Sequence, residues 1–381
     1  MSPIVIIGTG LAGYTVAREF RKLDSTTPLR LLSRDEAPFY SKPVLSNAYA
    51  QKKTASQIAL NTAREMGAQL HAVISPNIRV TAIDTQGHSI QAGDERIAYS
   101  KLVLAIGADP IRIPLEGDAA EAVLSVNDLA DYARLRAAAE GARRVSIMGA
   151  GLIGCEFAND LRGAGFEVDV IDPAPQPLGR LLPPQAAVFL RTALENIGVR
   201  FHFGTTVKSV ARGANNLDLT LADGSRMSAD VVLSAIGLRP RIELGTNAGI
   251  AVNRGIVTDG FLKTSAEDVY ALGDCAEVAG HNLPFVMPIM QAARALVKTL
   301  AGTPTAVLYP AMPVLVKTPA CPTVVCPPPP GVDGKWEETV SADGVRALFR
   351  DHSGQLRGFA LVGATTKDKQ ALVKDIPPLL G

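Results

Sequence analysis

The sequence reads V-I-I-G-T-G-L-A-G at residues 5–13 and V-S-I-M-G-A-G-L-I-G at residues 145–154. Each stretch is a short apolar run that ends in G-x-G-x-x-G, a pattern typical of a buried strand that turns sharply into a helix. The first glycine permits the tight turn, the second lets the backbone approach a pyrophosphate, and the third lets the helix pack closely on the strand. The free N–H groups at the start of the helix favour the phosphates. Two copies in one chain predict two dinucleotide-binding units of Rossmann type.

The segments that follow each glycine motif fit the same unit. After the first motif we expect a helix over residues 14–23 and a strand over 29–32. After the second motif we expect a helix over 155–163 and a strand over 166–171. The repeated order of strand, helix and strand makes a pair of unrelated glycine-rich turns the weaker alternative.

The residue at the end of the second strand of each unit indicates which nucleotide the unit binds. In the second unit this residue is Asp172. An acid there binds the ribose hydroxyls and repels the 2′-phosphate of NADP, so NAD(H) is favoured. The alternative is an ordinary surface aspartate before Pro173. In the first unit Ser33 takes this place, followed by Asp35 and Glu36, which leaves open the residue that meets the ribose.

Composition excludes several broad classes of protein. The 381 residues include 38 Lys and Arg against 37 Asp and Glu, a balance that argues against a nucleic-acid binder or a polybasic membrane-surface protein. No apolar run approaches the roughly 20 residues of a membrane span, and the N-terminus lacks the pattern of a signal peptide. Four cysteines without a C-x-x-C motif do not predict a disulfide framework, and five scattered histidines do not predict a metal site. We expect a cytoplasmic protein without membrane insertion.

α/β sheets bind their ligands beyond the carboxyl ends of their strands. Three further segments of the chain are expected to end there. Apolar strands within residues 102–108 and 231–240 lead into A-x-G, and the segment 264–274 ends in Gly-Asp. A strand-end Gly-Asp is by itself also an ordinary turn signal. Residues 286–300 are predicted to form a helix, with a proline near its first turn and Gly302 after its end.

Taken in order, these motifs resemble the pyridine nucleotide-disulfide oxidoreductase superfamily, over essentially the whole chain. The resemblance implies an α/β fold of glutathione reductase-like architecture, with two Rossmann-like domains for FAD and NAD(H) and a small α+β C-terminal domain. It also implies that Asp274 binds the FAD ribitol. Members that reduce disulfides or peroxide carry cysteine near residues 40–50, where this chain has none. We therefore expect electrons to leave the flavin without a cysteine relay.

The sequences of three short segments narrow the resemblance. Residues 41–46, 287–294 and 316–322 closely resemble those of bacterial rubredoxin–NAD(+) reductases. Flavorubredoxin reductases share much of the same sequence in these segments. The ferredoxin reductase components of oxygenase systems are more distant relatives. The resemblance implies an enzyme that takes hydride from NADH and passes single electrons to rubredoxin, a small acidic iron protein. Because the cofactor supplies the difficult chemistry, no acid–base dyad is required.

Five residues receive specific roles from the resemblance. Lys42 is expected near flavin N5 and paired with Glu156, since neither charge is stable alone in a dry site. Val286 is expected to open a helix whose N–H groups face the flavin C2 carbonyl, and the backbone of Val80 to meet the adenine. Lys317 is expected against the flavin. The alternatives are two ordinary helix or loop charges for the pair, a capped amphipathic helix that touches only the core, and a strand-surface lysine.

The resemblance assigns the dinucleotide contacts to motif and strand-end positions. The implied cofactor-binding residues are Gly8, Gly10, Leu11, Ala12, Gly13, Ser33, Arg34, Asp35, Lys42, Val80, Gly107, Gly149, Gly151, Ile153, Gly154, Glu156, Asp172, Gly237, Gly273, Asp274, Val286 and Lys317. Lys42 and Glu156 are also the candidate catalytic residues.

The expected acceptor sets an electrostatic requirement. Basic residues around the flavin edge would steer an acidic rubredoxin toward the protein, with Lys42, Lys317 and Arg294 as candidates. Cys321 and Cys326 are open to interpretation as a redox pair, but the proline run that follows favours a rigid extended segment.

The order of motifs predicts a discontinuous FAD-binding domain, residues 1–108 and 240–305, with the NAD-binding domain at 109–239 and a C-terminal domain at 306–381. The NAD-binding domain is expected to open with a helix near residues 127–140. The runs 345–350 and 355–362 predict a hairpin in the C-terminal domain. Two other functions stay open, a reductase of flavorubredoxin or a [2Fe–2S] ferredoxin, and a non-catalytic sensor that binds FAD and NAD.

Overall fold

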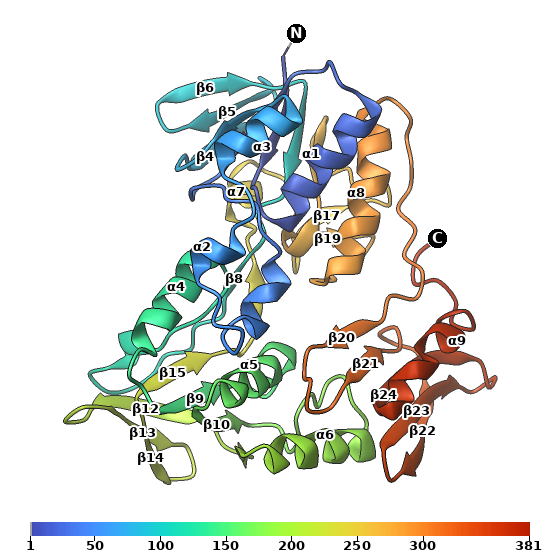
Figure 1. Ribbon diagram of the computed structural model, residues 1–381. Coiled ribbons are helices and arrows are strands. Elements are labelled where there is room, and N and C mark those ends of the chain that lie inside the picture. The colour runs from blue at the N-terminus through green and yellow to red at the C-terminus, as the bar shows by residue number, and fades with distance from the viewer. Residues whose placement is uncertain (1) are drawn as a thin grey trace.

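The computed structural model describes residues 2–381. Three sheets organise the molecule, two parallel and one antiparallel (Figure 1). The first two carry the two glycine motifs, and the third lies near the C-terminus. The α/β fold class with an antiparallel C-terminal unit is therefore confirmed. The expected domain boundaries at residues 108, 239 and 305 stay a prediction.

The first parallel sheet holds the first glycine motif. Helices α1 (Leu11–Leu23) and α8 (Val286–Leu300) pack against each other beside it, so the chain returns to this sheet after the second motif. The bounds of α8 agree with the prediction. In spatial order the strands are β18 (Val269–Ala271), β7 (Lys101–Leu104), β1 (Ile4–Ile7), β2 (Leu29–Leu32) and β3 (Val73–Ser75).

The second parallel sheet repeats the arrangement around helix α5 (Leu152–Gly163). Both motif helices begin three residues earlier than predicted, because Gly10 and Gly151 are themselves the N-cap residues. The predicted helix near residues 127–140 is α4 (Leu129–Ala138). In spatial order the strands are β11 (Val199–Phe203), β10 (Glu167–Asp172), β9 (Arg144–Met148) and β15 (Val231–Ser234).

The C-terminal sheet is antiparallel and contains the predicted hairpin, formed by β23 and β24. Helix α6 (Pro184–Asn196) packs on these two strands and also on β11, so one continuous apolar core joins the second and third sheets. In spatial order the strands are β20 (Val314–Val316), β21 (Thr323–Cys326), β24 (Leu356–Gly363), β23 (Gly344–Asp351) and β22 (Gly334–Ser341).

Smaller elements complete the architecture. Strands β8 and β16 pair with each other where the chain passes between the two parallel sheets (Figure 1). The remaining strands are β4 (Val80–Asp84), β5 (Ser89–Ala92), β6 (Glu95–Ala98), β8 (Ala108–Pro110), β12 (Val207–Arg212), β13 (Leu217–Leu221), β14 (Arg226–Ala229), β16 (Leu238–Pro240), β17 (Ile256–Thr258) and β19 (Ala276–Val278). The remaining helices are α2 (Ala55–Ile58), α3 (Ala63–Leu70), α7 (Glu243–Asn247) and α9 (Lys369–Val373), with 3₁₀ turns η1 (Lys42–Asn47), η2 (Ala120–Ala122), η3 (Gly273–Cys275) and η4 (Ala364–Asp368).

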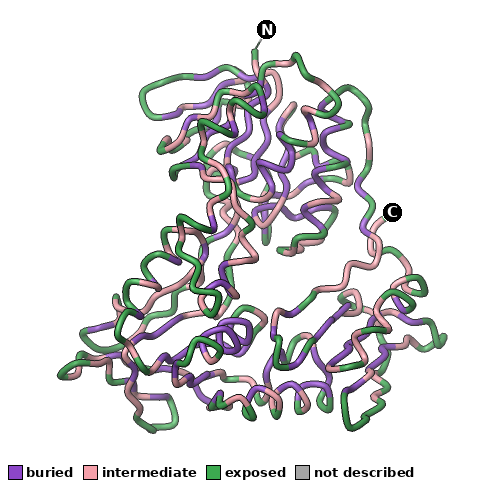
Figure 2. Tube along the Cα trace, viewed as in Figure 1, coloured by how far each residue is buried: buried purple, intermediate pink, exposed green. Residues whose placement is uncertain are grey.

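The strands and the inner faces of the helices form the buried core, and the exposed residues follow the loops and outer faces (Figure 2). Within residues 2–381, none of the helices has the length and apolar character needed to cross a membrane.

Candidate dinucleotide-binding site

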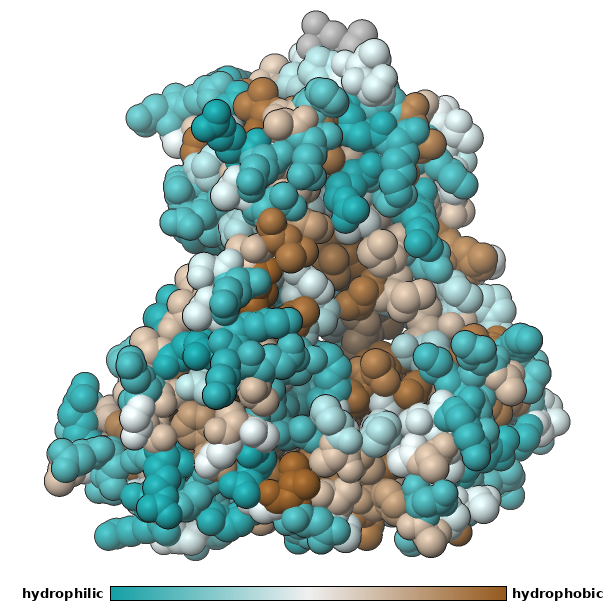
Figure 3. Space-filling view, in the orientation of Figure 1, coloured by the Kyte–Doolittle hydropathy of each residue, from teal (hydrophilic) through white to brown (hydrophobic). Residues whose placement is uncertain are grey.

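One large cavity lies between the two parallel sheets and the start of the C-terminal sheet, and apolar side chains gather in the hollow there (Figure 3). Its volume is about 1800 Å³, well above the roughly 300–1,000 Å³ of a typical small-ligand pocket. Both glycine motifs contribute to its wall. The cavity therefore has room for more than one large ligand.

The first glycine motif forms a cradle for phosphate at one end of the cavity. Gly8 has a φ of 107°, a conformation that side chains rarely adopt. A Cβ on Gly13 would lie 1.9 Å from the carbonyl oxygen of Gly8, so only glycine lets α1 come this close to β1. Gly10 caps α1 without a side-chain hydrogen bond, and a Cβ there would meet open space. The N–H groups of the helix start are thus available to an anion.

The second motif has the same geometry. Gly149 has a φ of 103°, and a Cβ on Gly154 would lie 1.9 Å from the carbonyl oxygen of Gly149. Gly151 caps α5 without a side-chain partner and also faces open space. The residues present fit two dinucleotides, one at the start of each helix.

The polar groups at the ends of β10 and β2, the strands that follow the two motif helices, differ in their hydrogen-bond partners. In the second unit, Asp172 accepts hydrogen bonds from the backbone N–H groups of Ala150 at 2.6 Å and Ala174 at 2.7 Å. This carboxylate therefore lies directly beside the glycine turn. In the first unit, Thr9 donates to Ser33 Oγ at 2.8 Å, and Ser33 Oγ donates to Asp35 at 2.6 Å.

The predicted ion pair between Lys42 and Glu156 is wrong. Lys42 Nζ lies 3.7 Å from Asp274 Oδ2 instead. Burial lowers the pKa of Lys42, and the nearby Asp274 carboxylate partly offsets this. Lys42 is the first residue of η1, its partner Asp274 lies in η3, and Glu156 lies on α5.

Glu156 is paired with Lys317 instead. Glu156 is 0 % exposed, and its Oε2 lies 2.5 Å from Lys317 Nζ. Lys317 Nζ also donates to Ser46 Oγ at 2.7 Å and to the carbonyl oxygen of Pro43 at 2.6 Å. Ser46 Oγ donates to Glu156 Oε2 at 2.5 Å, and the Lys317 backbone N–H donates to Glu156 Oε1 at 2.9 Å. The buried charge is therefore compensated by a cation and two further donors.

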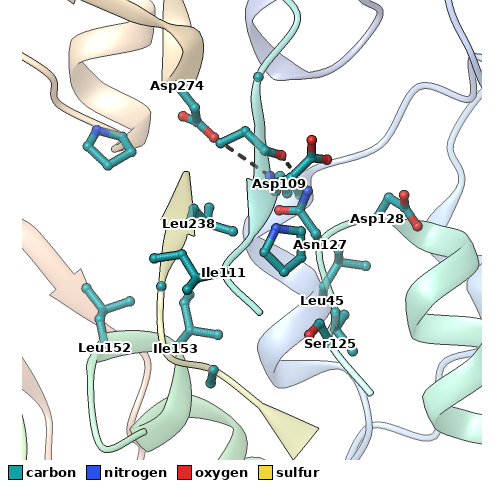
Figure 4. Close-up of a pocket in the computed structure, with 18 of the residues that line it drawn as sticks. Leu45, Asp109, Ile111, Ser125, Asn127, Asp128, Leu152, Ile153, Leu238 and Asp274 are labelled. Carbon is teal, nitrogen blue, oxygen red and sulfur yellow. Dashed lines mark hydrogen bonds and ion pairs between the residues drawn. The ribbon is translucent and has the colours of Figure 1, made fainter. Parts of the chain in front are cut away.

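A second polar cluster lies beside the two short strands β8 and β16, and its members Asp109 and Arg241 were not predicted from the sequence. Arg241 donates to Asp109 through Nε at 2.9 Å, and Arg34 Nη2 lies 3.4 Å from the same carboxylate. Figure 4 shows Asp109 and Asp274 in the upper part of the cavity, with Leu152 and Ile153 of α5 below them. Asp109 follows the A-x-G segment by two residues, a position that could have suggested it.

Most predicted site residues line this one cavity. Val80 opens β4, and Val286 opens α8, whose cap residue Phe285 provides no side-chain hydrogen bond. The predicted residues in the cavity wall are Gly8, Gly10, Leu11, Ala12, Ser33, Arg34, Asp35, Lys42, Val80, Gly107, Gly149, Gly151, Ile153, Glu156, Asp172, Gly237, Asp274, Val286 and Lys317.

Three predicted residues, Gly13, Gly154 and Gly273, lie behind the cavity wall. A Cβ on Gly273 would lie 2.9 Å from Cβ of Ala12. A Cβ on any of the three would meet a neighbouring atom within 3 Å, so all three permit close packing, and their contact with a nucleotide stays a prediction.

Cys321 and Cys326 are buried free thiols. Burial raises the pKa of each to about 11, so both are protonated at neutral pH. Within residues 2–381, the structure brings together no group of three or more His, Cys, Asp or Glu residues that could hold a metal ion.

Comparison with known proteins agrees with this geometry. Residues 2–298 match the family model described as pyridine nucleotide-disulphide oxidoreductase. The chain belongs to this family. Residues 306–376 match a second family model, the rubredoxin binding C-terminal domain.

Two relatives are similar to this chain over essentially their full length. The rubredoxin-NAD(+) reductase of Alcanivorax borkumensis is 51% identical over 381 residues, which cover 100% of both chains. The rubredoxin-NAD(+) reductase of Acinetobacter baylyi is 50% identical over 389 residues, covering 100% of this chain and 99% of the relative. Among solved structures, a ferredoxin reductase from Rhodopseudomonas palustris has a TM-score of 0.89 at 25% identity, covering 99% of this chain and 96% of that one.

Proposed function

We propose that the protein binds FAD at the first glycine motif and NAD(H) at the second, and that it carries electrons from NADH to rubredoxin. The observation that carries this proposal is the single cavity that both phosphate cradles share with the C-terminal segment. The names of the two relatives and of the C-terminal family model support rubredoxin as the acceptor.

Bound FAD supplies the chemistry that links a two-electron hydride donor to a one-electron acceptor. The protein orients the two nucleotides. The N-termini of α1 and α5 provide N–H donors for pyrophosphate, and Asp172 favours the ribose of NADH over the 2′-phosphate of NADPH. The start of α8 at Val286, which has no side-chain cap, would offer N–H donors to a flavin that gains negative charge on reduction.

Lys42 and Asp274 have adjoining roles in this proposal. Asp274 binds the ribitol chain, and Lys42 holds positive charge at the same wall of the cavity. Because Lys42 is paired with Asp274 and not with Glu156, its charge is held near the flavin-binding half. Glu156 also lines the cavity, where it binds Lys317 and Ser46.

The structure changes the expectation about electrostatic steering. Lys42 and Lys317 each lie beside a carboxylate, which reduces the positive field that either presents to an acceptor. Arg294 is exposed on α8. We therefore propose only modest steering. Rubredoxin reduction measured between about 20 and 500 mM salt should slow by less than tenfold.

Stopped-flow spectroscopy tests the proposed function. The purified protein should show a flavin spectrum, be reduced by NADH in preference to NADPH, and then reduce rubredoxin with repeated turnover. If flavorubredoxin or a [2Fe–2S] ferredoxin is reduced faster than rubredoxin, that protein is the acceptor in place of rubredoxin. Rapid flavin reduction without turnover on any iron protein would favour the sensor. We also propose a cytoplasmic location, since unpaired cysteines suit a reducing compartment.

A further inference from the structure

Helix α5 carries a stripe of buried polar side chains that bind other parts of the chain. Glu156, Asn159 and Asp160 are 0 %, 8 % and 6 % exposed. Their spacing of three and four residues places them on one face of the helix. Asp160 accepts N–H donors from the segment of residues 41–50, and Asn159 accepts one from the C-terminal segment. Three parts of the chain therefore meet on this face.

Asp160 binds backbone N–H groups, and within residues 2–381 it makes no ion pair with a basic side chain. Its carboxylate accepts the backbone N–H of Tyr49 at 2.8 Å and that of Ala50 at 3.2 Å. Burial raises the pKa of Asp160, and the two N–H donors partly offset this. A buried carboxylate held this way is costly to desolvate, and a backbone anchor is the benefit visible in the structure.

The anchored segment leads directly to the cavity. Residues 41–50 run through η1 (Lys42–Asn47), which packs against α5. Lys42, Leu45 and Ser46 of this turn line the cavity. Tyr49 follows the end of η1 at Asn47 by two residues, so a shift of Tyr49 should be passed along this short six-residue 3₁₀ helix to Lys42 at its start.

Tyr49 is also held by its side chain. Its ring lies edge-on to Phe166 with centroids 5.3 Å apart, and Arg136 stacks over it at 4.6 Å. The side chain of Tyr49 thus keeps the segment close to the second nucleotide-binding unit when the Asp160 contacts are removed. Loss of the carboxylate should loosen the segment without detaching it.

We propose that Asp160 is a positioning residue for hydride transfer. Its carboxylate fixes the Lys42 segment of the flavin-binding half to α5, the helix that starts the NAD-binding half. It thereby sets the spacing between the two nucleotides. The proposal rests on the NADH-to-flavin half of the proposed function and is independent of the identity of the electron acceptor.

The main test replaces Asp160 in the FAD-loaded protein. Asp160→Ala should slow flavin reduction by NADH about tenfold, since small displacements of reacting groups have large effects on rate. The dissociation constant for NADH should change less than about twofold, because no nucleotide contact is removed. Tyr49 and Ala50 donate to different oxygens of Asp160, so Asp160→Asn keeps an acceptor for one of the two N–H groups. Its rate of flavin reduction should fall between those of the unmodified protein and Asp160→Ala.

Hydrogen exchange provides a readout that does not depend on activity. The amides of Tyr49 and Ala50 should exchange at least about tenfold faster in Asp160→Ala than in the unmodified protein. Exchange of the backbone amides within α5 itself should be unchanged. Unaltered exchange at these two amides would overturn the proposal.

Asp230 offers a matched control. It accepts the backbone N–H groups of Arg143 and Arg144, both at 2.8 Å, but lies outside the cavity wall and within one structural unit. Asp230→Ala should accelerate exchange at those two amides and leave flavin reduction unchanged. An equal slowing of flavin reduction in Asp230→Ala and Asp160→Ala would overturn the proposal, since general loosening would then explain both.

The remaining outcomes also decide the question. Flavin reduction within twofold of the unmodified rate in FAD-loaded Asp160→Ala contradicts a positioning role. Should that variant fail to fold or retain FAD, Asp160→Asn is judged by the same two readouts. Because the flavin-reduction step needs no acceptor, failure of the unmodified protein to reduce rubredoxin would defeat the proposed acceptor and leave the role of Asp160 standing.

Discussion

The two glycine motifs begin alike and then place their helices in different surroundings. When Gly13 is aligned with Gly154, Thr15 of α1 takes the position of Glu156 of α5. Thr15 lies beside Met290 of α8, with its Oγ 3.9 Å from the sulfur, so α1 packs within its own unit. The corresponding face of α5 holds a buried acid that binds two other parts of the chain. The motif therefore determines the phosphate cradle, and the next turns of the helix determine what the helix contacts.

The ends of the following strands show a second difference. Asp172 is held by two backbone N–H groups beside its glycine turn. Ser33 is part of a chain of side-chain hydrogen bonds from Thr9 to Asp35. The first unit therefore offers a hydroxyl and a displaced carboxylate where the second offers one carboxylate.

The largest expected effect comes from adding a Cβ to the third glycine of either motif, and the property lost should differ between the two phosphate cradles. A Cβ at Gly13 or at Gly154 would lie 1.9 Å from a backbone oxygen, and forcing the backbone apart should cost about 3 kcal/mol. Gly13→Ala should abolish FAD retention. Gly154→Ala should keep FAD but lose reduction by NADH. Flavin absorbance after gel filtration and stopped-flow reduction measure both.

Gly260→Ala is the control for these substitutions, because a Cβ there would meet open space. It should keep both properties. If Gly154→Ala lost FAD as readily as Gly13→Ala, the two motifs would not serve separate nucleotides.

The next largest effect concerns the acid that only α5 buries. Lys317→Met leaves Glu156 buried without its cation and should lower the free energy of unfolding by about 3 kcal/mol. Adding Glu156→Gln should restore most of this loss, since the uncompensated charge is removed. Urea unfolding of the single and double variants measures the coupling.

The same double-variant test can be applied to the ion pair that was predicted from the sequence, with Lys42→Met and Glu156→Gln. Because Lys42 lies beside Asp274, these two substitutions should act additively. Strong coupling between Lys42 and Glu156 would contradict the observed pairing.

The smallest effects fall at the strand ends. Asp172→Asn should raise the KM for NADH about tenfold, equivalent to about 1.4 kcal/mol, and narrow the preference over NADPH. Ser33→Ala interrupts the Thr9–Asp35 chain and should weaken FAD binding by about 1 kcal/mol. Steady-state kinetics with both nucleotides and FAD titration of the apoprotein measure these changes. An Asp172→Asn variant with unchanged nucleotide preference would remove this residue from the ribose site.

Local features could be predicted from the sequence because each depends on neighbouring residues. Gly8 and Gly149 adopt the expected turn, and helix α8 has the predicted bounds. The hairpin of β23 and β24 also follows from a local turn signal. These features need only the preferences of the backbone and the apolar pattern of a few adjacent residues.

The partners of buried charges were decided by the tertiary structure. Glu156 and Lys317 are 161 residues apart, and nothing in either local sequence identifies the other. The same holds for the Asp160 carboxylate and the amide of Tyr49, which are 111 residues apart. Lys42 likewise lies beside Asp274, a residue far away in the sequence, and not beside Glu156 as predicted from the sequence. A glycine motif determines its own backbone, whereas a buried charge is compensated by whichever donors the packing of distant segments brings within hydrogen-bond distance.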